Sequence, residues 1–173
     1  MAVWIKLDSK GPVFYRQPRV GRGNKDFQLF KFRSMVTEAD KSGLLTVGGH
    51  DSRVTRAGYF IRKYKLDELP QLINVFLGDM SLVGPRPEVR KYVDMYTPEQ
   101  LHVLDVRPGI TDAASIKYRN ENDLLAAEEN PEQYYIDVIM PDKLRLNLEY
   151  VARHSVINDL KLIFETFIAI VRK

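Results

Sequence analysis

The stretch IRKYKLDELPQLINVFLGDMSLVGPRPEV, residues 61–89, contains the start and stop signals of a helix, followed by a proline-rich loop. Pro70 lacks an N–H and is tolerated only in the first turn of a helix, so this helix is predicted to begin near Leu66 or Asp67. Gly78 is expected to end it. Apolar residues at helical spacing are expected to form its buried stripe: Leu69, Leu72, Ile73 and Phe76.

The adjacent carboxylates Asp67 and Glu68 lie in the first turn of this predicted helix. Acidic residues at that position complement the helix macrodipole, which explains most such pairs without any function. A helix N-terminus also lowers the pKa of a carboxylate, so that a nucleophile stays ionised, and it offers N–H groups to a phosphate. Neighbouring helical residues diverge by about 100°. One carboxylate can therefore attack phosphorus while the other holds a metal.

Phosphate chemistry also requires cations that neutralise charge on the transferred group. Each basic residue is, by itself, commonly a solvated surface residue. Pro85 and Pro87 flank Arg86, and a proline follows Arg107, so these stiff loops lower the entropy cost of presenting an arginine. The candidate cations are Lys31, Arg33, Arg62, Arg86 and Arg107.

The residues before this stretch predict a β-hairpin followed by a basic helix. Short apolar runs place strands near residues 12–17 and 27–33, with a turn signal at residues 21–24. From Ala57 onward the apolar residues Phe60, Ile61 and Tyr64 take helical spacing, with basic residues between them.

The residues after it predict three further helices. Asn130 and Pro131 form one helix start, and Pro141 marks another. The final stretch, SVINDLKLIFETFIAIVRK, is amphipathic and rich in apolar residues. It is expected to pack on the protein's own core, with a position in a membrane interface as the alternative.

Composition indicates one domain over residues 1–173, with 45% hydrophobic and 28% charged residues. The sequence has no cysteine, which excludes disulfides and thiolate zinc sites and favours a reducing compartment. No window reaches the roughly 20 apolar residues that span a bilayer, and the start of the chain does not resemble a secretory signal. P-loop and Rossmann glycine patterns are absent from the sequence.

Charge is distributed unevenly along the chain. Residues 1–65 hold 14 Lys and Arg against 5 Asp and Glu, a net of +9, whereas residues 66–173 hold 12 against 18, a net of −6. The basic half favours an anionic partner. Nucleic acid, an anionic membrane surface and a phosphorylated substrate all fit, and charge alone does not choose between them.

Five motifs occur in the order GPVFYRQPRVGRG, FKFRSM, DSRVTRAGYFIRK, LDELPQLINVFLGDMSLVGPRP and VRPGIT. With them the chain resembles, from about Ile5 to its C-terminus, the bacterial sugar transferase family. These are monotopic phosphoglycosyltransferases that begin glycan assembly on a polyprenyl phosphate carrier. The resemblance implies a compact α+β catalytic core, mostly helical with a small β-hairpin element and amphipathic helices at the membrane interface.

The resemblance also implies an activity and a set of roles. A phosphosugar would pass from a UDP-sugar donor to undecaprenyl phosphate with release of UMP, and Mg²⁺ would be the cofactor. Asp67 would be the covalent nucleophile and Glu68 the residue associated with the metal. Nucleotide and phosphate binding, or support of this pair, would fall to Lys31, Arg62, Pro85, Arg86 and Pro87.

Two departures from the family pattern stand out. Asp112 and Ala113 occupy positions where many members have glycine and a large apolar residue, so this loop is expected to bear on sugar or nucleotide preference. Family members also carry a re-entrant membrane helix ahead of the segment that matches IKLDSKGPVF, and this sequence begins almost where that helix ends. We therefore expect a core without its anchor, peripheral or soluble in this form, acting at the cytoplasmic face of the bacterial inner membrane.

Parts of the sequence also fit two other functions. The stretch QPRVGRGNKDFQLFKFR interleaves arginine, glycine and aromatic residues as single-strand nucleic-acid binders do. A non-catalytic scaffold on a membrane surface would use the last helix and leave Asp67 as a mere helix start. The motifs favour the enzyme, so no nucleic-acid partner is expected, while a homo-oligomer is left open.

Overall fold

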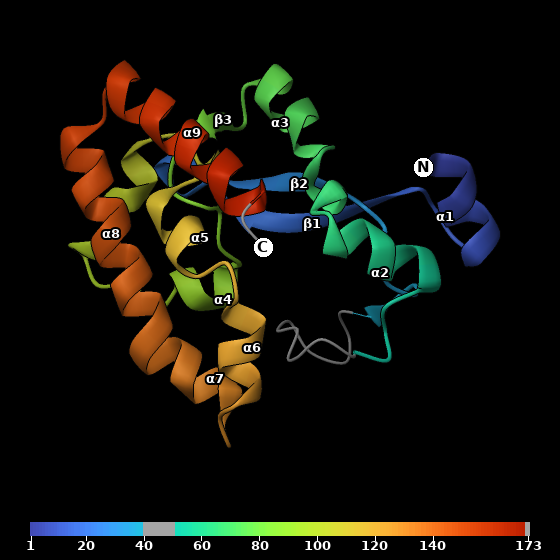
Figure 1. Ribbon diagram of the computed structural model, residues 1–173. Helices are drawn as coiled ribbons and strands as arrows, with labels where there is room; N and C mark the ends of the chain where they lie inside the picture. The colour runs from blue at the N-terminus through green and yellow to red at the C-terminus, as the bar shows by residue number, and fades with distance from the viewer. Residues whose placement is uncertain (40–50, 172–173) are drawn as a thin grey trace.

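The computed structural model of the protein describes residues 1–39 and 51–171 (Figure 1). The chain begins with a short helix that is followed by a β-hairpin. Helix α1 (Ala2–Asp8) precedes strands β1 (Phe14–Val20) and β2 (Asp26–Phe32). The strands are antiparallel and meet at a tight turn, η1 (Arg22–Asn24), in which Gly23 has a φ of 66°. The predicted hairpin and its turn are confirmed.

The predicted basic helix is α2 (Arg56–Lys63), which packs closely against the segment that follows β2. Thr55 caps it by accepting a hydrogen bond from the Gly58 N–H at 3.0 Å. A Cβ atom on Gly58 would lie 1.9 Å from the carbonyl oxygen of Ser34, so only glycine allows this approach. Ala57 and Ile61 join Ile5 in a small core cluster.

The predicted start of the next helix near Asp67 is wrong. Lys65 adopts a left-handed conformation with a φ of 55°, and this reverses the chain into a separate 3₁₀ turn, η3 (Leu66–Glu68). Helix α3 (Gln71–Leu77) begins only after Pro70, which stands at its N-cap. Gly78 ends α3 with a φ of 86°, as expected.

The stripe expected to be buried on α3 is exposed instead. Phe76 is 90% exposed and Leu72 is 50% exposed, whereas Asn74 is fully buried. The Asn74 side chain accepts a hydrogen bond from the Phe30 N–H at 3.0 Å and donates one to the Gln28 carbonyl at 2.8 Å. Helix α3 is therefore attached to the edge of β2 through a polar face, because unpaired strand groups there require partners.

A second small sheet, absent from the sequence-based expectation, lies beyond α3. Strands β3 (Ser81–Val83) and β4 (Gly109–Thr111) are parallel, with Ser81 opposite Gly109. Helix α4 (Arg90–Val93) and turn η4 (Gln100–Asp105) lie between them in sequence. The two strands are too short and too unlike an alternating pattern for periodicity to reveal them.

The remaining helices form the main core. Asn130 caps α7 through the Gln133 N–H and Pro141 lies in the first turn of α8, so both predicted helix starts are confirmed. A π-helical turn, η5 (Tyr135–Ile139), joins the two helices. The elements here are α5 (Ala113–Lys117), α6 (Glu121–Ala126), α7 (Pro131–Tyr134) and α8 (Met140–Arg153). Their core residues include Tyr92, Val103, Leu125, Tyr135, Ile139 and Leu144.

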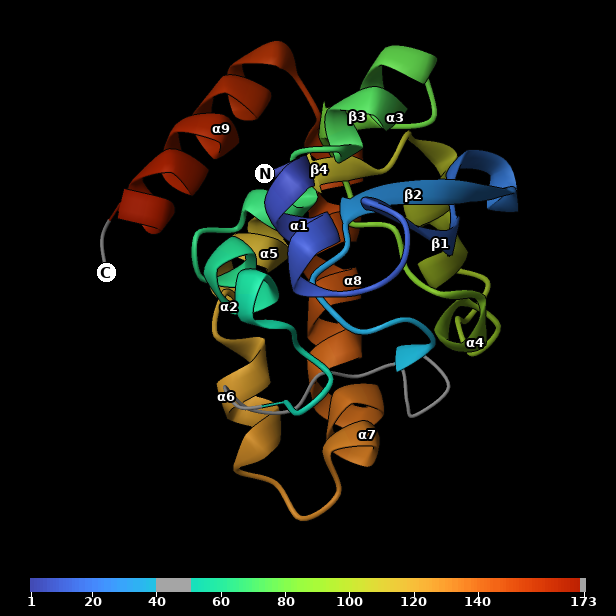
Figure 2. The same ribbon diagram turned by 90° about the vertical axis from the view of Figure 1, so that its right-hand side faces the viewer.

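Helix α9 (Val156–Val171) was expected to bury its apolar side chains against the core, but several of them are exposed. Ile157 is 79% exposed and Phe164 is 65% exposed. Helices α3 and α9 lie at the same end of the molecule, the top in both Figure 1 and Figure 2. Within residues 1–39 and 51–171, no helix has the length and apolar character that crossing a membrane requires. The chain as a whole has the predicted α+β, mostly helical architecture.

Replacement of Gly109 by alanine should destabilise the fold. The added Cβ would lie 2.1 Å from the Gly84 nitrogen and 2.5 Å from its oxygen, so β3 and β4 would have to separate. We expect the free energy of unfolding to fall by about 3 kcal/mol in urea titrations, since backbone atoms cannot move aside. Gly23→Ala is the control, because its Cβ meets no atom within 4 Å and only the φ of 66° is strained. It should cost about 1 kcal/mol; equal losses would contradict the close-approach argument.

Candidate active site

A cleft of about 1240 Å³ opens between the β-hairpin, turn η3, the loop that follows β3 and the helices α5, α6 and α9. It gathers basic and acidic residues from segments far apart in sequence. The predicted site residues that line it are Lys31, Arg33, Arg62, Asp67, Glu68 and Arg86. Its volume exceeds the range of about 300–1,000 Å³ typical of ligand pockets, so it can admit a large ligand.

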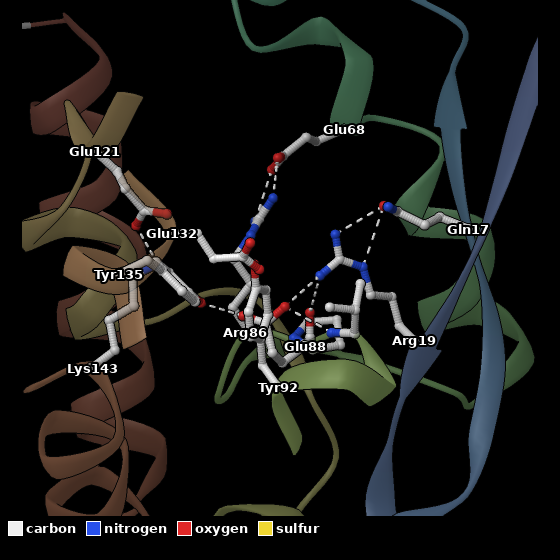
Figure 3. Close-up of polar contacts among 12 residues, drawn as sticks. Gln17, Arg19, Glu68, Arg86, Glu88, Tyr92, Glu121, Glu132, Tyr135 and Lys143 are labelled. Carbon is white, nitrogen blue, oxygen red and sulfur yellow. Dashed lines mark hydrogen bonds and ion pairs between the residues drawn. The ribbon is translucent and has the colours of Figure 1, made fainter. Parts of the chain in front are cut away.

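Glu68 and Arg86 form a two-point ion pair across the cleft (Figure 3). Nη1 of Arg86 donates to Oε2 of Glu68 at 3.1 Å, and Nη2 donates to Oε1. Burial alone would raise the pKa of Glu68, but the charges of Arg86 and Lys31 outweigh it and lower this pKa to about 2. The charge of Glu68 in turn raises the pKa of Arg86. Both groups are held in their charged forms.

Asp67 differs from its neighbour because no side chain among the described residues is shown to bind both of its carboxylate oxygens, as Arg86 does for Glu68. Oδ1 of Asp67 is buried and has no hydrogen-bond partner among the residues that the structure describes. Burial and the adjacent charge of Glu68 raise the pKa of Asp67, while Lys31 and Arg62 oppose that rise. The expectation that a helix N-terminus lowers this pKa is wrong, since Asp67 lies in a three-residue turn whose dipole is small.

Lys31 approaches the two carboxylates from the β-hairpin. It lies on β2 opposite Tyr15 of β1. Desolvation lowers the pKa of its ammonium group to about 8, and the charges of Glu68 and Asp67 limit that decrease. Together with Arg62 and Arg86, it makes a cationic lining around Asp67 that suits an anionic ligand.

The loop that presents Arg86 is held at both of its ends. Pro85 and Pro87 are buried on either side of the half-buried Arg86. On one side, the Gly109 N–H donates to the Pro85 carbonyl at 3.0 Å. On the other side, Glu88 accepts hydrogen bonds from Nη1 of Arg19 at 3.0 Å and from the Tyr135 hydroxyl (Figure 3). The stiff loop predicted from sequence is therefore also clamped by its neighbours.

Two of the predicted basic residues do not join the cationic lining around Asp67, although Arg33 is among the residues that line the cleft. The Arg33 side chain is buried and its guanidinium donates to backbone carbonyls at the end of α1, including that of Ser9 at 2.7 Å. Arg33 thus ties α1 to the hairpin. Arg107 is exposed and lies outside the residues that line the cleft.

Sequence reasoning assigned no role to several residues that the fold brings to the cleft. Tyr15, Gln17 and Arg19 alternate along β1 and all line it. Period-two spacing in the predicted strand was the signal that could have placed them on one face. Lys143 and Glu121 form an ion pair at the far side (Figure 3), and only the tertiary structure brings them together.

The carboxylates in the cleft suit a metal that the substrate helps to hold. No group of three or more His, Cys, Asp or Glu side chains within the described ranges could hold a metal alone. Mg²⁺, however, binds through one or two carboxylates together with substrate phosphates. The buried Oδ1 of Asp67 has no hydrogen-bond partner in the part of the chain that the structure describes, and a carboxylate such as Glu68 keeps lone pairs beyond those that Arg86 engages.

Comparison with known proteins gives similarities over part or all of the chain. One relative is 50% identical over 118 residues, 66% of this chain and 28% of its own length: the UDP-N-acetylgalactosamine-undecaprenyl-phosphate N-acetylgalactosaminephosphotransferase of Aeromonas hydrophila. Two UDP-glucose:undecaprenyl-phosphate glucose-1-phosphate transferases match almost the whole chain. That of Caulobacter vibrioides is 37% identical over 95% of this chain and 59% of its own length. That of Escherichia coli strain K12 is 38% identical over 96% of this chain and 34% of its own length.

The chain thus spans between 28% and 59% of the length of these relatives. The family model described as bacterial sugar transferase matches residues 1–173. The cleft with Asp67 and Glu68 lies inside that match. This protein belongs to the bacterial sugar transferase family.

Proposed function

We propose that this protein transfers a phosphosugar from a UDP-sugar to a polyprenyl phosphate and releases UMP. The observation that carries the proposal is the contrast between two adjacent carboxylates in one cationic cleft. Glu68 is bound by Arg86 at both oxygens, whereas Oδ1 of Asp67 has no partner in the described residues. The names of the relatives support the same donor and acceptor classes.

In the first step, a carboxylate oxygen of Asp67 attacks the phosphorus that bears the sugar. A bond forms between that oxygen and phosphorus, and the bond from phosphorus to the bridging oxygen of the diphosphate breaks. The bridging oxygen leaves with UMP and takes the electron pair. The product is an acyl phosphate that joins Asp67 to the phosphosugar.

In the second step, a phosphate oxygen of the polyprenyl phosphate attacks the same phosphorus. The new bond forms a diphosphate between the lipid and the sugar, and the bond to Asp67 breaks. Asp67 leaves as a free carboxylate and is ready for another donor. Two steps at one carboxylate allow donor and acceptor to use the same cationic lining in turn.

The cations around Asp67 would stabilise charge as it moves between phosphorus and the leaving oxygen. Lys31 and Arg62 already oppose the rise in the pKa of Asp67, so they favour its ionised, nucleophilic form. Arg86 keeps Glu68 ionised and in place. A Mg²⁺ ion held by Glu68 and by the donor's phosphate oxygens would add a Lewis acid at the leaving group.

The identity of the donor sugar has to be found by experiment, because the relatives are named for different sugars. One is named for N-acetylgalactosamine and two are named for glucose. A panel of UDP-sugars is therefore the appropriate substrate set.

We also propose that the exposed apolar end of the molecule contacts a lipid surface, where the polyprenyl acceptor is found. Helices α3 and α9 lie at the top of Figure 1 and Figure 2, and both carry exposed apolar side chains, among them Phe76 and Phe164. Patches of this kind mark interaction surfaces. An amphipathic helix in a membrane interface gains affinity from such side chains and from basic residues nearby.

Asp67→Asn should abolish the covalent step. The amide keeps the size of the carboxylate but is not a nucleophile for phosphorus. With a UDP-sugar and Mg²⁺ but no acceptor, the parent protein should release a burst of UMP and gain the mass of one phosphosugar. The variant should lose the mass gain and slow UMP release by at least about 1,000-fold.

Asp94→Asn is the matched control, because Asp94 is exposed and lies outside the cleft, and it should behave as the parent. Turnover by Asp67→Asn at the rate of its parent would show that another group is the nucleophile. A parent protein that binds vesicles but releases UMP from no UDP-sugar would instead be a membrane-surface scaffold.

Glu68→Gln should impair both the ion pair and the response to metal. The neutral amide leaves the charge of Arg86 unpaired and offers Mg²⁺ a weaker ligand. We expect UMP release to fall by about 10- to 100-fold and the Mg²⁺ concentration for half-maximal rate to rise. Glu128→Gln serves as the control, because Glu128 is exposed and lies outside the residues that line the cleft. An unchanged rate and Mg²⁺ requirement in Glu68→Gln would place the metal elsewhere.

Flotation with lipid vesicles tests the apolar surface. The parent should float with anionic vesicles at low salt more than with neutral ones. A variant with Phe76→Ser and Leu77→Ser should lose most of this binding, and because both side chains are exposed the fold should persist. Leu124→Ser on α6, at the opposite end of the molecule, should float as the parent does. Equal flotation of all three proteins would rule this surface out.

A further inference from the structure

Asp112 is a fully buried carboxylate that does not line the cleft but accepts hydrogen bonds from two residues that do, Arg86 and Ser115. Its Oδ1 accepts a hydrogen bond from the Ser115 N–H, which caps helix α5. Its Oδ2 accepts a hydrogen bond of 2.7 Å from the backbone N–H of Arg86. The side chain is 0% exposed and does not line the main cleft, so it cannot contact a donor sugar directly. The expectation that this position bears on specificity thus requires an indirect route.

The bond to Arg86 engages the only backbone donor in its part of the loop. Pro85 and Pro87 have no N–H, so between Gly84 and Glu88 only Arg86 can donate from the main chain. The prolines fix their own φ angles, and Pro87 restricts the conformation of Arg86. One hydrogen bond to the Arg86 N–H is then enough to set the direction in which its side chain leaves the loop.

Asp112 also continues the pairing of β3 with β4 past the point where the backbone can do so. The Gly84 N–H donates to the Thr111 carbonyl at 3.1 Å, and the Gly109 N–H donates to the Pro85 carbonyl at 3.0 Å. The next acceptor along the chain is the Asp112 carboxylate, and the next donor opposite is the Arg86 N–H. The Asp112 side chain therefore accepts from the Arg86 N–H just beyond the ends of the two strands.

The cap of α5 by itself does not require a buried charge. Serine or asparagine caps a helix about as well as aspartate, and an isolated buried carboxylate is costly unless it is hydrogen-bonded. What the carboxylate adds is a second oxygen acceptor, and that acceptor is taken by Arg86. Its charge also lies near the guanidinium, where it adds to the larger effect of Glu68 in raising the pKa of Arg86.

We propose that Asp112 is a positioning residue that fixes the Arg86 loop so that its guanidinium meets Glu68 beside Asp67. The consequence for catalysis rests on the proposed phosphosugar transfer. The placement of Arg86 does not, and it can be measured in a protein without substrate.

Asp112→Ser separates the two roles of the carboxylate. The shorter hydroxyl can still cap α5 through the Ser115 N–H, but it cannot also reach the Arg86 N–H. Nitrogen-15 NMR of the arginine side chains then reports on the ion pair with Glu68. In the parent, the two Nη groups of Arg86 should give distinct signals because the two-point pair hinders their rotation. In Asp112→Ser these signals should broaden or merge, whereas Asn130→Ala, which removes the cap of α7 far from the cleft, should leave them unchanged.

Activity provides the second readout. Asp112→Ser should lower the rate of the UMP burst by about 10- to 100-fold with little change in KM, as expected for a misplaced charge in the site. On an Arg86→Ala background the same change should cost no more than about twofold, because the side chain through which it acts is absent. Asp112→Asn keeps the size of the side chain and one oxygen acceptor, so it should reduce the rate of the UMP burst by an intermediate amount. This variant replaces Asp112→Ser if the serine variant does not fold.

Two results would overturn the proposal. One is an unchanged pair of Arg86 Nη signals in a folded Asp112 variant. The other is an equal loss of rate in the presence and absence of the Arg86 side chain. If the parent releases no UMP from any UDP-sugar, the proposed reaction fails, but the NMR comparison still decides whether Asp112 positions Arg86.

Discussion

The ion pair between Glu68 and Arg86 is the interaction on which the arrangement of the cleft depends. Glu68 belongs to the turn that follows α2, and Arg86 belongs to the loop that follows β3, so the pair joins segments on opposite sides of the cleft. Exposed pairs contribute about 0–1 kcal/mol. This one is partly buried and binds at two points, which adds geometric specificity to its energy. It satisfies one carboxylate of the adjacent pair and leaves Asp67 for another partner.

Around this pair, buried polar side chains hydrogen-bond backbone groups that further strands would pair in a larger sheet. Both described sheets have only two strands, so their edges carry backbone groups in need of partners. Asn74 satisfies the edge of β2, and Asp112 satisfies the loop after β3. Arg33 binds carbonyls at the end of α1. Each of these side chains connects two segments through hydrogen bonds that fix both position and direction, which a hydrophobic contact alone would not.

The same reliance on polar connections accounts for the exposed apolar end. Helix α3 is held to β2 by Asn74, so its apolar residues are released from the core and point outward. Helix α9 contacts α5 and the short parallel sheet, yet much of its apolar surface remains exposed. A helix with this pattern is stable next to an apolar medium, and in the proposed reaction a lipid surface at this end would hold the polyprenyl acceptor near the cleft.

From the sequence alone follow several of the local elements and the family to which the chain belongs. Turn and proline signals placed the hairpin, the stop at Gly78 and the helix starts at Asn130 and Pro141, because these depend on backbone preferences of a few residues. The motifs singled out Asp67, Glu68 and Arg86 as residues of one site. Only the tertiary structure decided which of them are paired, because the Glu68–Arg86 contact joins residues whose separation no periodicity encodes. It also decided that α3 buries Asn74 rather than Leu72, that Arg33 is structural and that Asp112 supports Arg86. Helical spacing shows which residues share a face, but which face is buried depends on the partners that the fold places against it.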